Sequence, residues 1–283
     1  MPNPMLAPLP EWTSTSLHLH RATQVLGLIQ RVVLPAQPSY LHLALLPQPY
    51  GVATQPLPSG TSLQLDFGAA QVRYSPAHGA STSLELAAHS PASLLEALLH
   101  TAHHDLFAHL NPVQGTLTAA LQAHAESEEP LSAEPFAIHA ETAAGYADAL
   151  AAVFTGMSRA RAQIGGLQTP LVIWPEHFDM ATLLFHRSNA AMDDYQPHVS
   201  LGFAPFTPDQ YPRPYLYGYA YPYQPDPTQT PAPAAAAWHT AGWTGLVVPY
   251  DTLAAQAQPV DAVEQYCMQF YVTLTSVLQV ESA

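Results

Sequence analysis

The chain contains no lysine, and all seven of its basic residues are arginines. Schiff-base catalysis, anchoring of pyridoxal phosphate and the P-loop of nucleotide-binding enzymes each require a lysine amine. We therefore expect neither a pyridoxal phosphate cofactor nor a P-loop nucleotide. With a formal net charge of −14, the chain also lacks the basic surface that nucleic acids and anionic membranes bind. Neither is an expected partner.

Cysteine and long apolar runs are equally scarce. Cys267 is the only cysteine, which excludes an intrachain disulfide and a thiolate metal cluster. Residues 1–4 do not begin a secretion signal, and no run of about 18 apolar residues follows anywhere. We therefore expect a cytoplasmic protein. The sequence carries no signal for a particular oligomeric state.

Hydrophobic residues make up 48% of the 283 residues, which is enough to bury one large core or two smaller ones. Apolar residues recur at helical spacing in four segments, and short segments between Pro and Gly fit antiparallel strands. The expected helices are residues 11–34, 90–107, 143–164 and a C-terminal helix that begins at the cap pair Asp261 and Glu264 and buries Cys267. The expected strands are residues 40–46, 52–54, 62–67, 71–74, 81–86, 171–174, 179–185, 199–203, 215–221 and 243–248.

These elements predict an α+β fold in which helices pack against antiparallel sheets. We expect a single domain over residues 1–283. Within it, residues 1–110 and 142–283 each run helix, strands, helix, as an internal duplication would produce, although no residue-level repeat supports one. Residues 111–141 hold an acidic cluster without firm periodicity, so they are expected to form an irregular linker.

The most informative stretch is residues 174–179, Trp-Pro-Glu-His-Phe-Asp. If residues 177–179 are extended, His177 and Asp179 face the same side of a strand. There they could act, with Glu176, as catalytic acids and bases, or ligate a metal.

A metal site would need further ligands, and His198 and His239 are the natural candidates because each lies beside a strand in the same half. With His177 and Asp179 they would hold a divalent transition metal. The alternative is structural, since His177 and Asp179 could simply hydrogen-bond to each other or to loop backbone.

Tyrosines alternate along residues 215–221, which places them on one face of a straight strand. Tyr217 and Tyr219, with Trp174 and Trp243, could stack a flat or sugar-like ligand there. The alternative is a sheet face packed beneath a helix, because β-strands favour tyrosine.

Eight short segments match one protein family in order and spacing: residues 19–27, 51–58, 65–67, 169–170, 174–181, 202–203, 217–222 and 248–250. Through them nearly the whole chain resembles a bacterial family of unknown function, DUF5996. The resemblance implies a single α+β unit, but no known reaction, cofactor or catalytic residue. Because His20 and Gln24 lie in a matching segment, it adds both to the candidate ligand-binding residues, beside His177 and Asp179.

Two functions follow from these candidates. The first is a metal-binding protein or acid/base enzyme that acts on a small molecule through His177, Asp179 and their neighbours. The second is a non-catalytic module that binds a small ligand or a protein through its Tyr- and Trp-rich strand. A third interpretation is purely structural, with each of these residues satisfied within the fold.

Overall fold

The computed structural model describes residues 6–57, 59–102, 131–187, 189 and 191–280. Over these residues the fold is α+β, with helices and two antiparallel sheets, as the sequence predicts. Most of the predicted linker, together with the end of the helix expected at residues 90–107, lies outside the described residues. Among the described residues, no helix is long and apolar enough to cross a membrane.

The chain divides into two compact units. The N-terminal unit comprises Leu9–Ala147 and Ile173–Phe178. The C-terminal unit comprises Met1–Pro8, Asp148–Val172 and Asp179–Ala283. The segment that the sequence singles out, residues 174–179, is therefore divided between the two units after Phe178.

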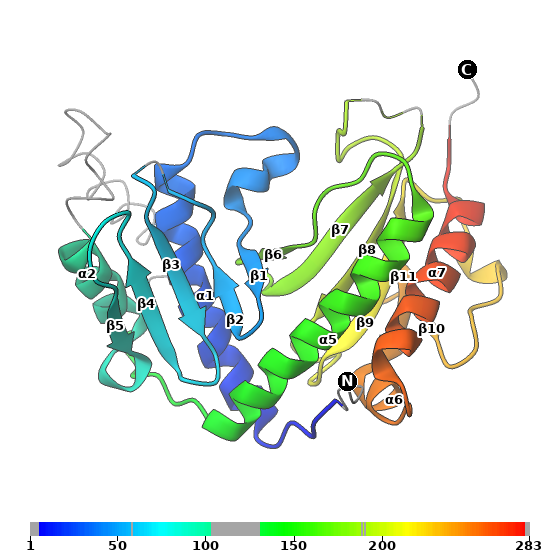
Figure 1. The fold of residues 1–283 in the computed structure, drawn as a ribbon. Helices are drawn as coiled ribbons and strands as arrows, with labels where there is room; N and C mark the ends of the chain where they lie inside the picture. The colour runs from blue at the N-terminus through cyan, green and yellow to red at the C-terminus, as the bar shows by residue number, and fades with distance from the viewer. Residues whose placement is uncertain (1–5, 58, 103–130, 188, 190, 281–283) are drawn as a thin grey trace. The chain divides into compact units, whose positions relative to one another are not determined.

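The sheet of the N-terminal unit is an antiparallel meander in the strand order β1-β2-β3-β4-β5 (Figure 1). Its strands are β1 (Leu46–Gln48), β2 (Gly51–Ala53), β3 (Ser62–Asp66), β4 (Gln71–Ser75) and β5 (Thr82–Glu85). The accompanying helices are α1 (Trp12–Val33), η1 (Pro38–Leu43), η2 (Leu86–Ala88), α2 (Pro91–Thr101) and the start of α5 (Ala140–Ile164).

Alternation of apolar residues explains how this sheet packs. Leu63 and Leu65 of β3 and Val72 of β4 are fully buried, while their strand neighbours are more exposed. Helix α1 packs against β3 and α2. Helix α2 begins where the sequence predicts, because the Ser90 side chain accepts a hydrogen bond from the Ser93 amide.

One predicted strand of this unit is wrong. Residues 38–43 form the short helix η1, in which Ser39 and Tyr40 have positive φ angles of 50° and 54°. The buried amide of Gln30 on α1 donates to the carbonyls of His42 (3.0 Å) and Ala44 (2.9 Å). The segment is therefore held by a helix side chain, which local strand propensity does not report.

The second sheet has the strand order β10-β11-β9-β8-β7-β6, and its strands β7 to β11 lie in the C-terminal unit. The strands are β6 (Val172–Trp174), β7 (Asp179–Phe185), β8 (His198–Ala204), β9 (Tyr215–Tyr221), β10 (Ala237–His239) and β11 (Gly245–Pro249). The helices are the rest of α5, η3 (Pro227–Gln229), α6 (Tyr250–Ala254) and α7 (Pro259–Val277). Strands β7 and β9 match their predicted limits, whereas β10 was not predicted.

Helix α7 covers one face of this sheet. A Cβ atom added to Gly218 of β9 would lie 2.9 Å from Leu274 and 3.1 Å from Phe270, so helix and strand are in close contact there. Cys267 belongs to the same apolar stripe and is fully buried, which raises the pKa of its thiol to about 12. The predicted burial of this cysteine in the core is confirmed.

The predicted start of α7 is wrong, because the helix begins at Pro259, before the expected cap pair. Asp261 and Glu264 instead lie 2.9 Å and 3.7 Å from the guanidinium of Arg159 on α5. The two helices are also close at Gly156, where an added Cβ would lie 2.6 Å from the Val260 carbonyl oxygen.

Candidate functional site

Residues 175–178 form a turn, not the extended segment that would place His177 and Asp179 on one strand face. Phe178 has a φ of 59°, in the left-handed region that bulky side chains seldom adopt. Its amide donates to the Trp174 carbonyl (2.7 Å), and its buried ring lies 5.8 Å from that of Tyr146. The extended backbone on which the expected same-face pair depends is therefore absent at residues 177 and 178.

Helix α1 holds this turn within the N-terminal unit. Nε2 of His20 donates to the carbonyls of Pro175 (3.0 Å) and Glu176 (2.9 Å), and its ring stacks on Phe178. Burial is the main cause that lowers the pKa of His20, which keeps the ring neutral. A Cβ added to Gly27 would lie only 2.5 Å from Pro175. Two of the segments that carry the family resemblance thus pack against each other.

The remaining candidates of this unit have no shared centre. Glu176 and His177 are exposed in the turn, and Trp174 is half-buried at the end of β6. Gln24 is half-buried one helical turn after His20. The described contacts therefore give His20 a structural role in positioning the turn.

The four residues predicted to bind a metal are divided between the units, with His177 in the N-terminal unit and Asp179, His198 and His239 in the C-terminal unit. Among the residues that the structure describes, no three His, Cys, Asp or Glu side chains are grouped as metal ligands. The metal site therefore stays a prediction, without geometric support.

Both ring nitrogens of His239 are engaged within the fold. Nε2 donates to the Ala241 carbonyl (2.8 Å), so Nδ1 accepts from the Tyr211 hydroxyl (2.9 Å). His198 donates from Nδ1 to the Gln196 carbonyl (2.8 Å), and burial is the main cause that lowers its pKa. Both rings therefore belong to hydrogen-bonded aromatic packing.

The tyrosines of β9 share one face of the second sheet. The register pairs Tyr217 with Gly202, and Tyr219 with Ser200, across β8 and β9. Helix α7 packs on the opposite face, at Gly218. Neighbouring aromatic rings extend the tyrosine row, and we call the whole set the aromatic face: Tyr211, Tyr215, Tyr217, Tyr219, Tyr221, His198, His239 and Trp243.

The rings of the aromatic face form a continuous surface. Those of Tyr217 and Tyr219 are parallel within 4°, with centroids 6.3 Å apart. Trp243 lies 6.0 Å from Tyr217 and 4.4 Å from His239. Tyr217, Tyr219 and Trp243 are half-buried, and Tyr221 is 41% exposed. Tyr215, His198 and His239 are buried, so only part of the face is open.

Two glycines allow these rings to lie across the strands. A Cβ added to Gly202 of β8 would overlap the ring and hydroxyl of Tyr217. A Cβ added to Gly245 of β11 would overlap the Gly218 carbonyl oxygen and lie 2.5 Å from the indole of Trp243. A glycine inside a strand weakens the strand, and often marks a place where another group approaches closely. At Gly202 that group is the Tyr217 ring, and at Gly245 it is both the backbone of β9 and the Trp243 indole.

Asp179 of β7 anchors the Tyr217 ring, because the Tyr217 hydroxyl donates to the Asp179 carboxylate across β8. Burial is the main cause that raises the pKa of Tyr217 well above its ordinary value, and the Asp179 charge adds to it. Burial also raises the pKa of Tyr219, with further contributions from Asp179 and Asp194. The phenols therefore remain neutral beside two carboxylates.

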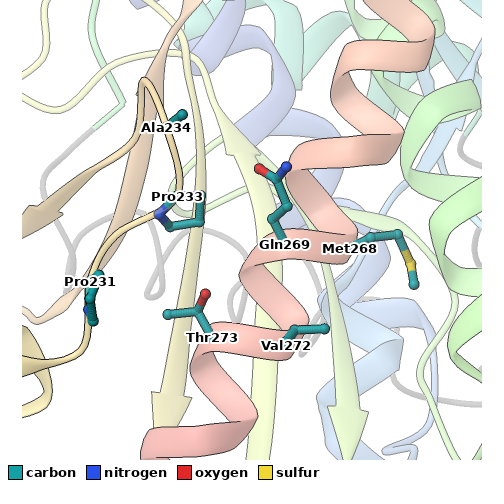
Figure 2. Close-up of a pocket in the computed structure, with 7 residues that line it drawn as sticks. All are labelled: Pro231, Pro233, Ala234, Met268, Gln269, Val272 and Thr273. Atoms are coloured by element: carbon teal, nitrogen blue, oxygen red, sulfur yellow. The ribbon is translucent and has the colours of Figure 1, made fainter.

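A separate shallow pocket of about 390 Å³ lies between the Pro- and Ala-rich loop and α7. Figure 2 shows Pro231 and Pro233 on the loop side, and Met268 and Val272 on the helix side. Its polar lining consists of Gln269 and Thr273, which carry no charge. This pocket offers apolar contact but no titratable group.

The sequence identified Tyr217, Tyr219 and Trp243 but missed the residues that orient them. It did not connect Asp179 with the tyrosines, or assign a role to Gly202 and Gly245. The available signal was a glycine in the interior of a predicted strand, next to an alternating run of tyrosines.

Comparison with known proteins agrees with the resemblance seen in the sequence. The model of a family described as Family of unknown function (DUF5996) matches residues 4–282, nearly the whole chain. No curated protein and no solved structure matches significantly. The family resemblance is confirmed, and the chain belongs to the DUF5996 family of unknown function.

Proposed function

We propose that this protein binds a small molecule and that the aromatic face is its binding surface. The observation that carries the proposal is the pair of glycines: Gly202 lets the Tyr217 ring lie across β8, and Gly245 leaves room for the Trp243 indole. Aromatic side chains placed in this way offer broad apolar contact to a ligand. Because Tyr217, Tyr219 and Trp243 keep partial exposure, a ligand can reach them.

The hydrogen bonds of the face favour binding over acid/base catalysis. His239 has both ring nitrogens bonded within the fold. A general base needs a free acceptor within reach of the substrate proton. These hydrogen bonds fix the orientation of the aromatic rings, which supports a role for the face in ligand recognition.

Saturation-transfer NMR with three small probes tests this proposal. The probes are methyl β-glucopyranoside, indole and tetramethylammonium chloride, each mixed with the full chain. We expect at least one probe to bind the native protein, and binding to be lost in Tyr219→Ala and in Trp243→Ala.

The matched control is Tyr50→Ala, which removes a tyrosine that is 63% exposed and belongs to the N-terminal unit. This variant should keep the binding, and circular dichroism should show that all three variants are folded. Absence of binding by every probe, or binding that survives in both Tyr219→Ala and Trp243→Ala, would contradict the proposal.

A further inference from the structure

We propose that the ligand of the aromatic face is an organic cation carrying an alkylated ammonium group. This assignment rests on the proposed function, since it names the chemical class that the same surface would bind. Three independent features of the C-terminal unit support it: the committed phenol hydroxyls, the carboxylates beside the rings, and the aromatic surface itself.

Four of the five tyrosine hydroxyl groups of the face are already engaged within the protein. Tyr217 donates to Asp179, and Tyr211 donates to Nδ1 of His239. Tyr215 shares a hydrogen bond with Thr207, and Tyr219 shares one with Ser200. A polyhydroxy ligand needs free donors and acceptors to replace its bonds to water. These tyrosines therefore offer ring surface in preference to hydrogen bonds.

Negative charge lies close to the rings. The Asp179 carboxylate contacts Tyr217 directly, and the charges of Asp179 and Asp194 both act on Tyr219. Donation from a phenol to a carboxylate also increases the electron density of the phenol ring. Both effects strengthen the attraction of a cation to the ring faces.

The chemistry of the surface favours a large, weakly hydrated cation over a small one. Among the described residues no group of carboxylates and imidazoles is arranged to hold a metal ion. Aromatic faces cannot replace the water shell of a small, strongly hydrated ion, whereas they match an alkylated ammonium group, whose charge is spread over apolar methyl groups. The net charge of −14 further favours encounter with cations.

The test compares choline with 3,3-dimethylbutan-1-ol, a neutral molecule of nearly the same shape, by isothermal titration of the full chain. We expect choline to bind at least about tenfold more tightly, because only the cation gains the electrostatic attraction. We expect Asp179→Asn to weaken choline binding by about fivefold, because it removes one nearby charge while Asn still accepts from Tyr217.

Asp226→Asn is the matched control, because it makes the same charge change at an exposed position of the loop after β9. If Asp179→Asn does not fold, Tyr219→Leu serves instead, because it keeps side-chain bulk and removes one π face, and should weaken choline binding by about fivefold.

Equal affinity for choline and its neutral isostere would overturn the cation assignment. Binding of only indole or only the glucoside would also overturn it. After either result, loss of binding in Tyr219→Ala would still support the aromatic face as the binding surface. If no probe binds, the proposed function fails together with the assignment.

Discussion

The ring of His20 lies parallel to that of Phe178, with 8° between their planes and 5.8 Å between their centroids. Phe178 needs this support because its left-handed backbone costs about 1–2 kcal/mol relative to an ordinary conformation. The same imidazole also donates to Pro175 and Glu176, so one side chain of α1 holds the whole turn.

Replacement of His20 by phenylalanine should destabilise the protein. Phenylalanine keeps a ring against Phe178 but removes the donor to the two carbonyls, so the free energy of unfolding should fall by about 1–2 kcal/mol. Urea unfolding measures it. His177→Ala is the control, because His177 is exposed in the same turn, and it should change stability by less than about 0.5 kcal/mol. Equal effects of both variants would contradict the structural role of His20.

Alanine at Gly27 should destabilise the protein although alanine favours helices by about 1 kcal/mol over glycine. The added Cβ would lie 2.5 Å from Pro175, and overpacking of this kind costs about 1–3 kcal/mol. A double-mutant cycle with Pro175→Gly isolates the contact. The Gly27→Ala penalty should shrink in the Pro175→Gly background; an unchanged penalty would show that the clash is not its cause.

Stability should fall as the pH is lowered below 6.5. Burial is the main cause that lowers the pKa of His20 and His198 from 6.5, so the unfolded chain takes up protons that the folded chain does not. The free energy of unfolding therefore decreases from about pH 7.5 to about pH 5.5. Urea midpoints across this range measure the slope, which should be smaller in His198→Asn. A flat or rising stability on acidification would contradict the prediction.

The phenol of Tyr217 should ionise at a lower pH in Asp179→Asn than in the native protein. Burial is the largest cause of its raised pKa, and the Asp179 charge adds to it, so only part of the shift should be lost. Absorbance at the tyrosinate band during alkaline titration measures the change. The part of the titration curve that is lost in Tyr217→Phe belongs to Tyr217. Asp226→Asn should leave the titration of Tyr217 unchanged. If Tyr217 ionised at the same pH in Asp179→Asn and in the native protein, the Asp179 charge would have no effect on the Tyr217 phenol.

Much of the fold could be predicted, because the spacing of apolar and aromatic residues along the chain identifies most helices and strands. The alternation of residues 215–221 places β9 correctly, and the apolar spacing around Cys267 gives the buried stripe of α7. Strand β10 was missed because it follows a Pro- and Ala-rich loop and has only three residues, Ala237–His239. Such a short strand depends on its partner β11, which local sequence does not report.

The candidate site was harder to predict than the fold, since it depends on contacts between distant segments. Phe178 has no side-chain feature that indicates a left-handed backbone, so the sequence allowed an extended segment from His177 to Asp179. Likewise, the need for Gly202 arises only because the Tyr217 ring crosses β8 to reach Asp179. Both features depend on contacts between segments that are distant in the sequence, which residue spacing does not report.

The burial of Cys267 has a practical use. Because the only thiol is buried on the inner face of α7 and has a pKa of about 12, thiol reagents should not modify the native protein. A cysteine introduced on the surface would then be the sole site of labelling, with no native thiol to remove first. Two such cysteines, one in each unit, would carry spin labels whose separation reports the arrangement of the units in solution.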